Sequence, residues 1–137
     1  MATRAHMKIQ NALIQEFTVA SGQTVTEGLS VKFASADDEC QNCGAGEDGF
    51  GVALGSGAAG EKVSILLDGI AVVKVKVGTG GTATRGSYAI TNATGHTNQA
   101  IADGTTVRYL RGKFMQSGTA GDLVGMLVGG ITPKSTA

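Results

Sequence analysis

Short apolar runs separated by glycine are the feature that most constrains how this chain can fold. Glycine contributes 22 of the 137 residues, and the single proline is Pro133. The glycines follow no collagen-like period and form no linker, because they stand singly or in small groups between apolar runs. Glycine in such places is typical of tight turns that need a positive φ angle. We therefore expect a chain that turns often and whose regular elements are short.

Alternation of apolar and polar residues predicts that these elements are β-strands. Valine and lysine alternate over residues 73–77, and residues 28–34 alternate in the same way. Further strands are expected at residues 13–19, 50–54, 61–68, 88–91, 99–102, 106–115 and 122–128. We therefore expect an all-β fold, a compact antiparallel β-sandwich or barrel of about 8–10 short strands.

The length of the chain favours a single domain. We expect a β domain at residues 12–130, a flexible N-terminal arm at residues 1–11 and a frayed tail at residues 131–137. Residues 4–15 also contain apolar residues at partly helical spacing. A short helix there is the alternative to an extended arm.

Two pairs of segments resemble each other within the chain. Residues 22–28 read GQTVTEG and residues 80–86 read GGTATRG, 58 positions later. Residues 59–63 and 120–124 are similar at a spacing of 61. The similarity indicates either a duplicated β unit or one turn sequence that is used twice, and the sequence leaves both open.

Composition argues against two classes of partner. Eleven basic and eleven acidic residues balance, and no basic cluster is present, so we expect no binding to nucleic acid. No apolar stretch reaches the ~18–20 residues of a membrane span, and the N-terminus lacks the apolar region of a signal peptide. We expect a protein that is made in a cytoplasm and binds no membrane.

The one sequence that invites a chemical interpretation is the pair Cys40 and Cys43. It lies within residues 36–49, which are polar and acidic and are predicted to form a surface loop. Two cysteines supply half of a zinc site, but no further ligand stands at a suitable spacing. The neighbouring acids do not match the calcium-binding loop pattern. We therefore predict inert thiols or a disulfide there, with no metal and no cofactor.

No catalytic arrangement stands out either. The glycine-rich strings lack the motifs of phosphate-binding loops, and no serine nucleophile motif occurs. The two histidines, His6 and His96, stand alone in the sequence. We predict no catalytic residues and no enzymatic activity.

Several runs, taken in order, resemble a known family. These runs are GQTVTEGLSV, GFGVAL, AAGEKVSILLDGIAVVKV, TRGSYAIT and AGDLVGMLV. In their order and spacing they resemble the capsid decoration (cement) proteins of tailed bacteriophages. The acidic, cysteine-containing segment at residues 36–49 departs from that pattern.

The resemblance implies a structural protein on the outer surface of the virion capsid. Such a protein would bind the expanded phage head and stabilise contacts between major capsid subunits, as a homotrimer at three-fold or quasi-three-fold positions. The basic arm would contact the major capsid protein through Arg4, His6, Lys8 and Ile9. The alternative is another virion-surface or carbohydrate-binding β module without catalysis. The absence of tryptophan and the presence of only two tyrosines weaken sugar binding.

Overall fold

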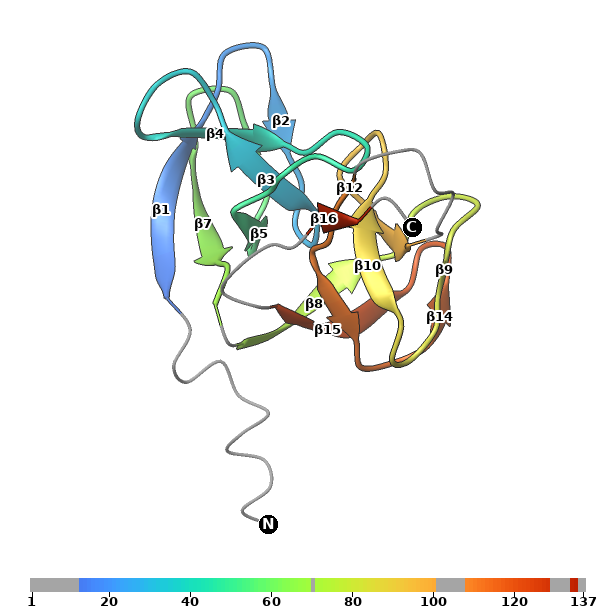
Figure 1. The fold of residues 1–137 in the computed structure, drawn as a ribbon. Coiled ribbons are helices and arrows are strands. Elements are labelled where there is room, and N and C mark those ends of the chain that lie inside the picture. The colour runs from blue at the N-terminus through green and yellow to red at the C-terminus, as the bar shows by residue number, and fades with distance from the viewer. Residues whose placement is uncertain (1–12, 70, 101–107, 129–133, 136–137) are drawn as a thin grey trace.

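The computed structural model describes residues 13–69, 71–100, 108–128 and 134–135. Throughout these residues the regular elements are β-strands, with no helix, which confirms the predicted all-β class. Figure 1 shows the strands in two neighbouring groups, the first half of the chain on the left and the second half on the right. The alternative of a helix at residues 4–15 lies almost wholly outside the described part of the chain, and the last two of these positions begin the first strand.

The first half forms a small barrel. Its strands are β1 (Ile14–Val19), β2 (Thr24–Val25), β3 (Ser30–Phe33), β4 (Glu39–Asn42), β5 (Gly51–Ala53), β6 (Gly57–Ala58) and β7 (Lys62–Leu67). Five of them close into a barrel in the order β1-β4-β3-β5-β7. Strands β1 and β4 are parallel and the other neighbours are antiparallel. The short strands β2 and β6 pair with each other beside the barrel.

The second half repeats this arrangement. Its strands are β8 (Ala71–Lys76), β9 (Thr82–Ala83), β10 (Tyr88–Thr91), β11 (Thr97–Gln99), β12 (Arg108–Tyr109), β13 (Gly112–Phe114), β14 (Gly118–Thr119), β15 (Leu123–Val128) and β16 (Lys134–Ser135). The main sheet has the order β11-β10-β13-β15-β8, and a parallel bridge from Val77 to Thr97 joins its two edges. Strands β9 and β14 pair beside it, as β2 and β6 do in the first half.

The register of the strands shows that the two halves are copies of one unit. Positions before β4 correspond at an offset of 58, and positions from β5 to β7 at an offset of 61. The corresponding pairs, first half and then second, are Thr18–Lys62 and Lys76–Leu123, Ser30–Val52 and Tyr88–Lys113, Val52–Leu66 and Lys113–Leu127, and Thr24–Ala58 and Thr82–Thr119. The weak similarity within the sequence therefore marks a structural duplication.

Hydrogen bonds outside the strands repeat at the same offsets. The amide of Glu27 donates to Ser56 Oγ, and the amide of Arg85 donates to Ser117 Oγ. A side-chain carboxylate then accepts from a backbone amide three residues before it, at Glu61 and again at Asp122. The turns as well as the strands of the unit are thus duplicated.

Each barrel has an apolar interior. The interior of the first contains Phe17, Val19, Val25, Val31, Cys40, Ala53, Val63 and Ile65. The second cluster consists mainly of residues from β8, β10, β13 and β15, but it also includes Val52 and Leu66 of the first half. The second core therefore extends across the junction between the halves and joins them.

Arg111 forms the polar part of this junction. Its side chain is fully buried, yet all five of its N–H donors have acceptors in the first half. Nε donates to Ser30 Oγ at 3.2 Å, and the two terminal nitrogens donate to the carboxylate of Asp68 at 2.6 and 2.9 Å. The same nitrogens donate to the carbonyls of Gly49 and Gly51 at 2.8 and 3.1 Å. The burial of this charge is therefore compensated only when the halves are together.

The duplicated turns make matched substitutions possible. Gly22 and Gly80 occupy corresponding turns with φ angles of +75° and +72°, and a Cβ at either position would meet no atom within 4 Å. We expect Gly22→Ala and Gly80→Ala each to lower the free energy of unfolding by about 1–2 kcal/mol, because the cost is that of a left-handed backbone alone. Urea denaturation would measure both. A loss at one position only would contradict the equivalence of the turns.

Removing the buried guanidinium should weaken the contact between the halves and so destabilise the folded protein. We expect Arg111→Met to lower the free energy of unfolding by about 3–5 kcal/mol, because Asp68 and two carbonyls lose a charged partner. The exposed Arg85 gives a control, since Arg85→Met should change stability by no more than about 0.5 kcal/mol. Equal denaturation midpoints for the two variants would show that the Arg111 network contributes nothing.

Candidate binding surfaces

The predicted capsid contacts Arg4, His6, Lys8 and Ile9 lie outside the described residues. The described chain begins at Leu13, whose side chain is 66% exposed, and the next residue, Ile14, is 48% exposed. The described chain therefore starts with apolar, accessible side chains.

The interpretation of residues 36–49 as a surface loop is wrong in part. Strand β4 runs through this segment, and Cys40 and Cys43 are both buried as free thiols. Cys40 packs inside the first barrel, while the Cys43 sulfur lies so close to Gly49 that a Cβ there would be 2.8 Å away. The exposed acidic side chains are Asp37 and Asp38 before β4 and Asp48 after it. The two cysteines thus pack in different surroundings, and no disulfide joins them.

Burial also suppresses the chemistry of these thiols. It raises the pKa of Cys43 to about 12, although the nearby Arg111 acts in the opposite direction. Burial likewise raises the pKa of Cys40. Since the thiolate is the nucleophile and the metal ligand, both side chains are held in their inert form at neutral pH. Among the described residues, no three His, Cys, Asp or Glu side chains are grouped so that they could hold a metal ion.

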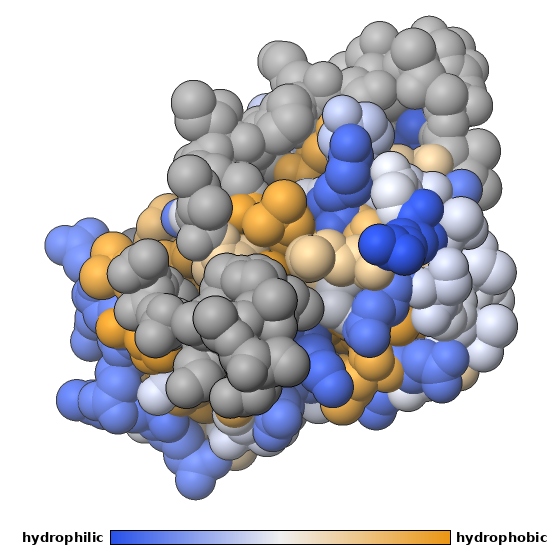
Figure 2. Space-filling view, turned by 90° about the horizontal axis from the view of Figure 1, so that it is seen from below, coloured by the Kyte–Doolittle hydropathy of each residue, from blue (hydrophilic) through white to orange (hydrophobic). Residues whose placement is uncertain are grey.

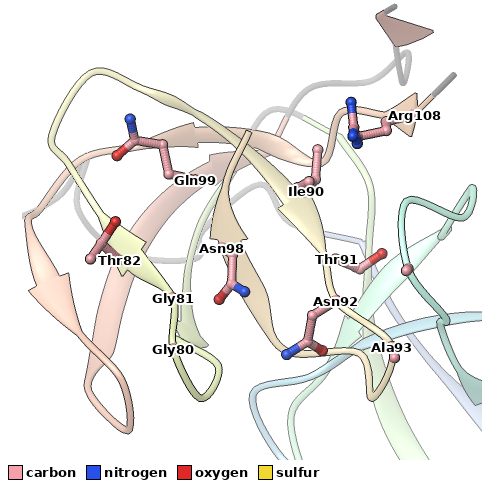
Figure 3. Close-up of a pocket in the computed structure, with 11 residues that line it drawn as sticks. Gly80, Gly81, Thr82, Ile90, Thr91, Asn92, Ala93, Asn98, Gln99 and Arg108 are labelled. Atoms are coloured by element: carbon pink, nitrogen blue, oxygen red, sulfur yellow. The ribbon is translucent and has the colours of Figure 1, made fainter. Parts of the chain in front are cut away.

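A polar groove lies on the second half, and its volume is about 410 Å³. Figure 3 shows it between the β8–β9 turn and strands β10 and β11, with Asn92 and Asn98 pointing toward each other. Gly78 and Gly81 make room for these amides, because a Cβ at Gly78 would overlap the amide of Asn92 and a Cβ at Gly81 would overlap the amide of Asn98. Asn98 Oδ1 accepts a hydrogen bond from the Gly78 amide at 2.9 Å. This groove is a product of local glycine packing that the sequence pattern did not indicate.

The groove has binding character without catalytic groups. The amide oxygen of Asn92 accepts from Thr94 and from the His96 amide, and its amide nitrogen lies against Gly78. The described lining residues include the cation Arg108 and several amides and hydroxyls, but no carboxylate, thiol or imidazole. The groove could hold a small ligand rich in hydrogen-bond acceptors, and its lining offers no general acid or base.

An aromatic cluster stands at the surface of the first barrel. The rings of Phe33 and Phe50 are stacked, with centroids 4.0 Å apart, and Phe17 packs against Phe50 at 4.8 Å. Phe17 is buried, but Phe33 is 62% exposed. Such an exposed ring, held by two others, is a common element of protein interfaces. The alternation over residues 28–34 predicted Phe33 on an inward face, and its place at the end of β3 leaves it uncovered.

The outer face of the second barrel is also partly apolar. Leu123 and Leu127 of β15 are 51% and 41% exposed, and Tyr88 of β10 is 53% exposed. The Lys113 ammonium lies 5.1 Å from the centre of the Tyr88 ring, so the ring is not a free platform on which a sugar could stack. Figure 2 shows hydrophobic residues between hydrophilic ones on the lower face of the molecule.

Charge is divided between the halves. Residues 13–69 contain nine acidic and two basic side chains, whereas residues 70–137 contain seven basic and two acidic ones. The balanced total that was evident from composition thus conceals an acidic first half and a basic second half. In the part of the chain that the structure describes, no helix is long and apolar enough to span a membrane.

Comparison with known proteins identifies a related fold. No protein-family model and no curated protein sequence matches the chain. Among solved structures, it is similar to the N base of the head fiber protein gp8.5 of bacteriophage phi29, with a TM-score of 0.68 and 16% sequence identity. The match covers 85% of this chain and 93% of that chain. At this identity the likeness concerns the fold.

The buried thiols should be unreactive in the folded protein. We expect neither cysteine to react with an alkylating reagent at mildly alkaline pH, and both to react in denaturant, because burial holds them protonated and inaccessible. Mass spectrometry would count the modified thiols. Fast labelling of the native chain would contradict the described positions of Cys40 and Cys43.

Proposed function

We propose that this protein is a capsid decoration protein of a tailed bacteriophage. It binds the outer surface of the expanded head and stabilises contacts between major capsid subunits, as a homotrimer at three-fold or quasi-three-fold positions. The observation that carries the proposal is the shared fold with the phi29 head fiber base, which extends over nearly the whole of both chains. The order of the sequence runs that resemble cement proteins supports the same assignment independently.

The distribution of groups on the described surface fits a binding role without catalysis. Apolar side chains are exposed at Leu13 and Phe33 on the first half and at Leu127 on the second. A protein that is present in many copies on a symmetric lattice gains strength from several modest contacts of this kind. The free thiols are buried, and the polar groove lacks an acid–base pair.

In this proposal the arm at residues 1–11 makes the first contact with the major capsid protein. It carries Arg4 and Lys8 and no acidic residue, and it begins from the exposed Leu13 and Ile14. An extended segment of this kind can add a strand to the edge of a neighbouring sheet. Its charge allows it to recognise an acidic region of the capsid subunit.

Removing the arm provides the test. We expect deletion of residues 2–11 to abolish co-sedimentation with expanded phage heads, and the melting temperature of the domain to remain unchanged. Replacing Arg4 and Lys8 by glutamate should weaken binding about tenfold or more, because two attractive charges become repulsive. A double Lys62→Glu, Lys76→Glu variant keeps the arm and makes the same change of charge on the barrels, so it controls for net charge. Unchanged binding of the truncated protein would exclude the arm as the contact.

A further inference from the structure

The contact between the two halves uses a defined row of residues on the first half. Ser30, Val52 and Leu66 stand side by side across β3, β5 and β7, on the outer face of the first barrel. All three are 0% exposed. Val52 and Leu66 belong to the core of the second half, and Ser30 accepts a hydrogen bond from Arg111. The outer face of the first barrel is thus covered by the second.

The corresponding row of the second half is open. At the same offsets it consists of Tyr88, Lys113 and Leu127, side by side across β10, β13 and β15. Tyr88 is 53% and Leu127 41% exposed, and Lys113 is exposed as well. The duplicated unit therefore offers the same outer row twice, and among the described residues the first row is covered while the second is exposed.

The surface of the second half that packs on the first row also has a counterpart on the first half, and there the counterpart is the accessible one. On the second half it includes Thr91 and Arg111, which are 1% and 2% exposed. The Thr91 hydroxyl donates to the carbonyl of Gly44, and the Arg111 side chain donates to Ser30 of that row. The corresponding residues of the first half are Phe33 and Phe50, whose stacked rings remain accessible.

We infer that a second copy of this chain covers these surfaces. The outer row Tyr88–Lys113–Leu127 of one molecule packs on the aromatic cluster Phe17–Phe33–Phe50 of the next. The contact repeats between molecules the arrangement that joins the halves within each molecule. The polar pairing of Arg111 with Ser30 is replaced by contact of Phe50 and Phe33 with Tyr88 and Leu127, so the contact between molecules is more apolar.

Charge favours this pairing over contact between like halves. Asp37 and Asp38 follow Phe33 closely in the chain and are exposed. Lys113 lies within the outer row, and Lys74 and Arg85 line a groove of about 610 Å³ that includes Val72, the cross-strand neighbour of Leu127. An acidic surface of one molecule would thus meet a basic surface of the next, whereas two first halves or two second halves would repel each other.

Such a contact is heterologous, because two different surfaces meet. Contacts of this type close into a ring when the rotation allows it and otherwise form an open chain. As the contact within a trimer, the inference rests on the proposed function. As a contact between copies in solution, it is tested in the absence of phage heads, so its failure is distinguishable from failure of head binding.

Two single variants provide a sharp test. Phe33→Asp removes the aromatic surface and Leu127→Asp removes the outer row, and both side chains are exposed enough for the fold to tolerate the change. We expect the mass of the wild-type protein, measured by sedimentation across a concentration range, to rise with concentration and to fall with added salt. Each variant alone should associate at least about tenfold more weakly than the wild type. An equimolar mixture of the two should form a 1:1 dimer and nothing larger, because each molecule keeps one complementary surface.

The control is Ala120→Asp, which adds the same charge at an exposed turn of the second half away from the row. It should associate like the wild type, and circular dichroism should show all three variants folded. A wild-type protein that is monomeric at every concentration and salt level would overturn the inference. So would folded variants that associate normally, or a mixture of the two single variants that stays monomeric.

Discussion

The buried guanidinium of Arg111 is the interaction on which the arrangement of this protein depends. It comes from the second half, and its partners Ser30, Gly49, Gly51 and Asp68 all come from the first. An unpaired charge in this position would be strongly unfavourable. The apolar residues Val52 and Leu66 add a non-directional attraction, whereas the five directed hydrogen bonds fix one orientation of the two barrels. The rigid relation between the exposed surfaces follows from that orientation.

Duplication explains why the two halves differ in which surfaces are covered. Two copies of one unit cannot both be covered in the same way when they pack head to tail within a single chain. At two corresponding positions the residue type follows the difference in burial: the buried Ser30 corresponds to the exposed Tyr88, and the exposed Phe33 corresponds to the buried Thr91. The acidic and basic halves follow the same division. The fold shared with the phi29 head fiber base, over most of both chains, includes both halves.

Much of the fold could be predicted from the sequence, because strand alternation and glycine turns are local signals. The alternation of Val73 and Val75 with Lys74, for example, describes β8 correctly. The burial of Cys40 and Cys43 could not be predicted, since it depends on contacts with β1 and with Arg111 that are distant in sequence. The similarity at spacings of 58 and 61 suggested two explanations, and only the register of strand pairing distinguishes them. The role of Arg111 could not be predicted from the sequence, because its partners lie 43 to 81 positions away.

The separation between Asp68 and Arg111 also has a consequence for biosynthesis. A ribosome adds about 5–20 residues each second, so the 43 positions between them correspond to a delay of roughly 2–9 s. During that interval the first barrel can be complete while Val52 and Leu66 are still open to solvent. A nascent chain in this state presents the same kind of uncovered row that the finished protein keeps at Leu127. Slow or paused translation over the second half would therefore prolong the period in which emerging chains are prone to associate wrongly.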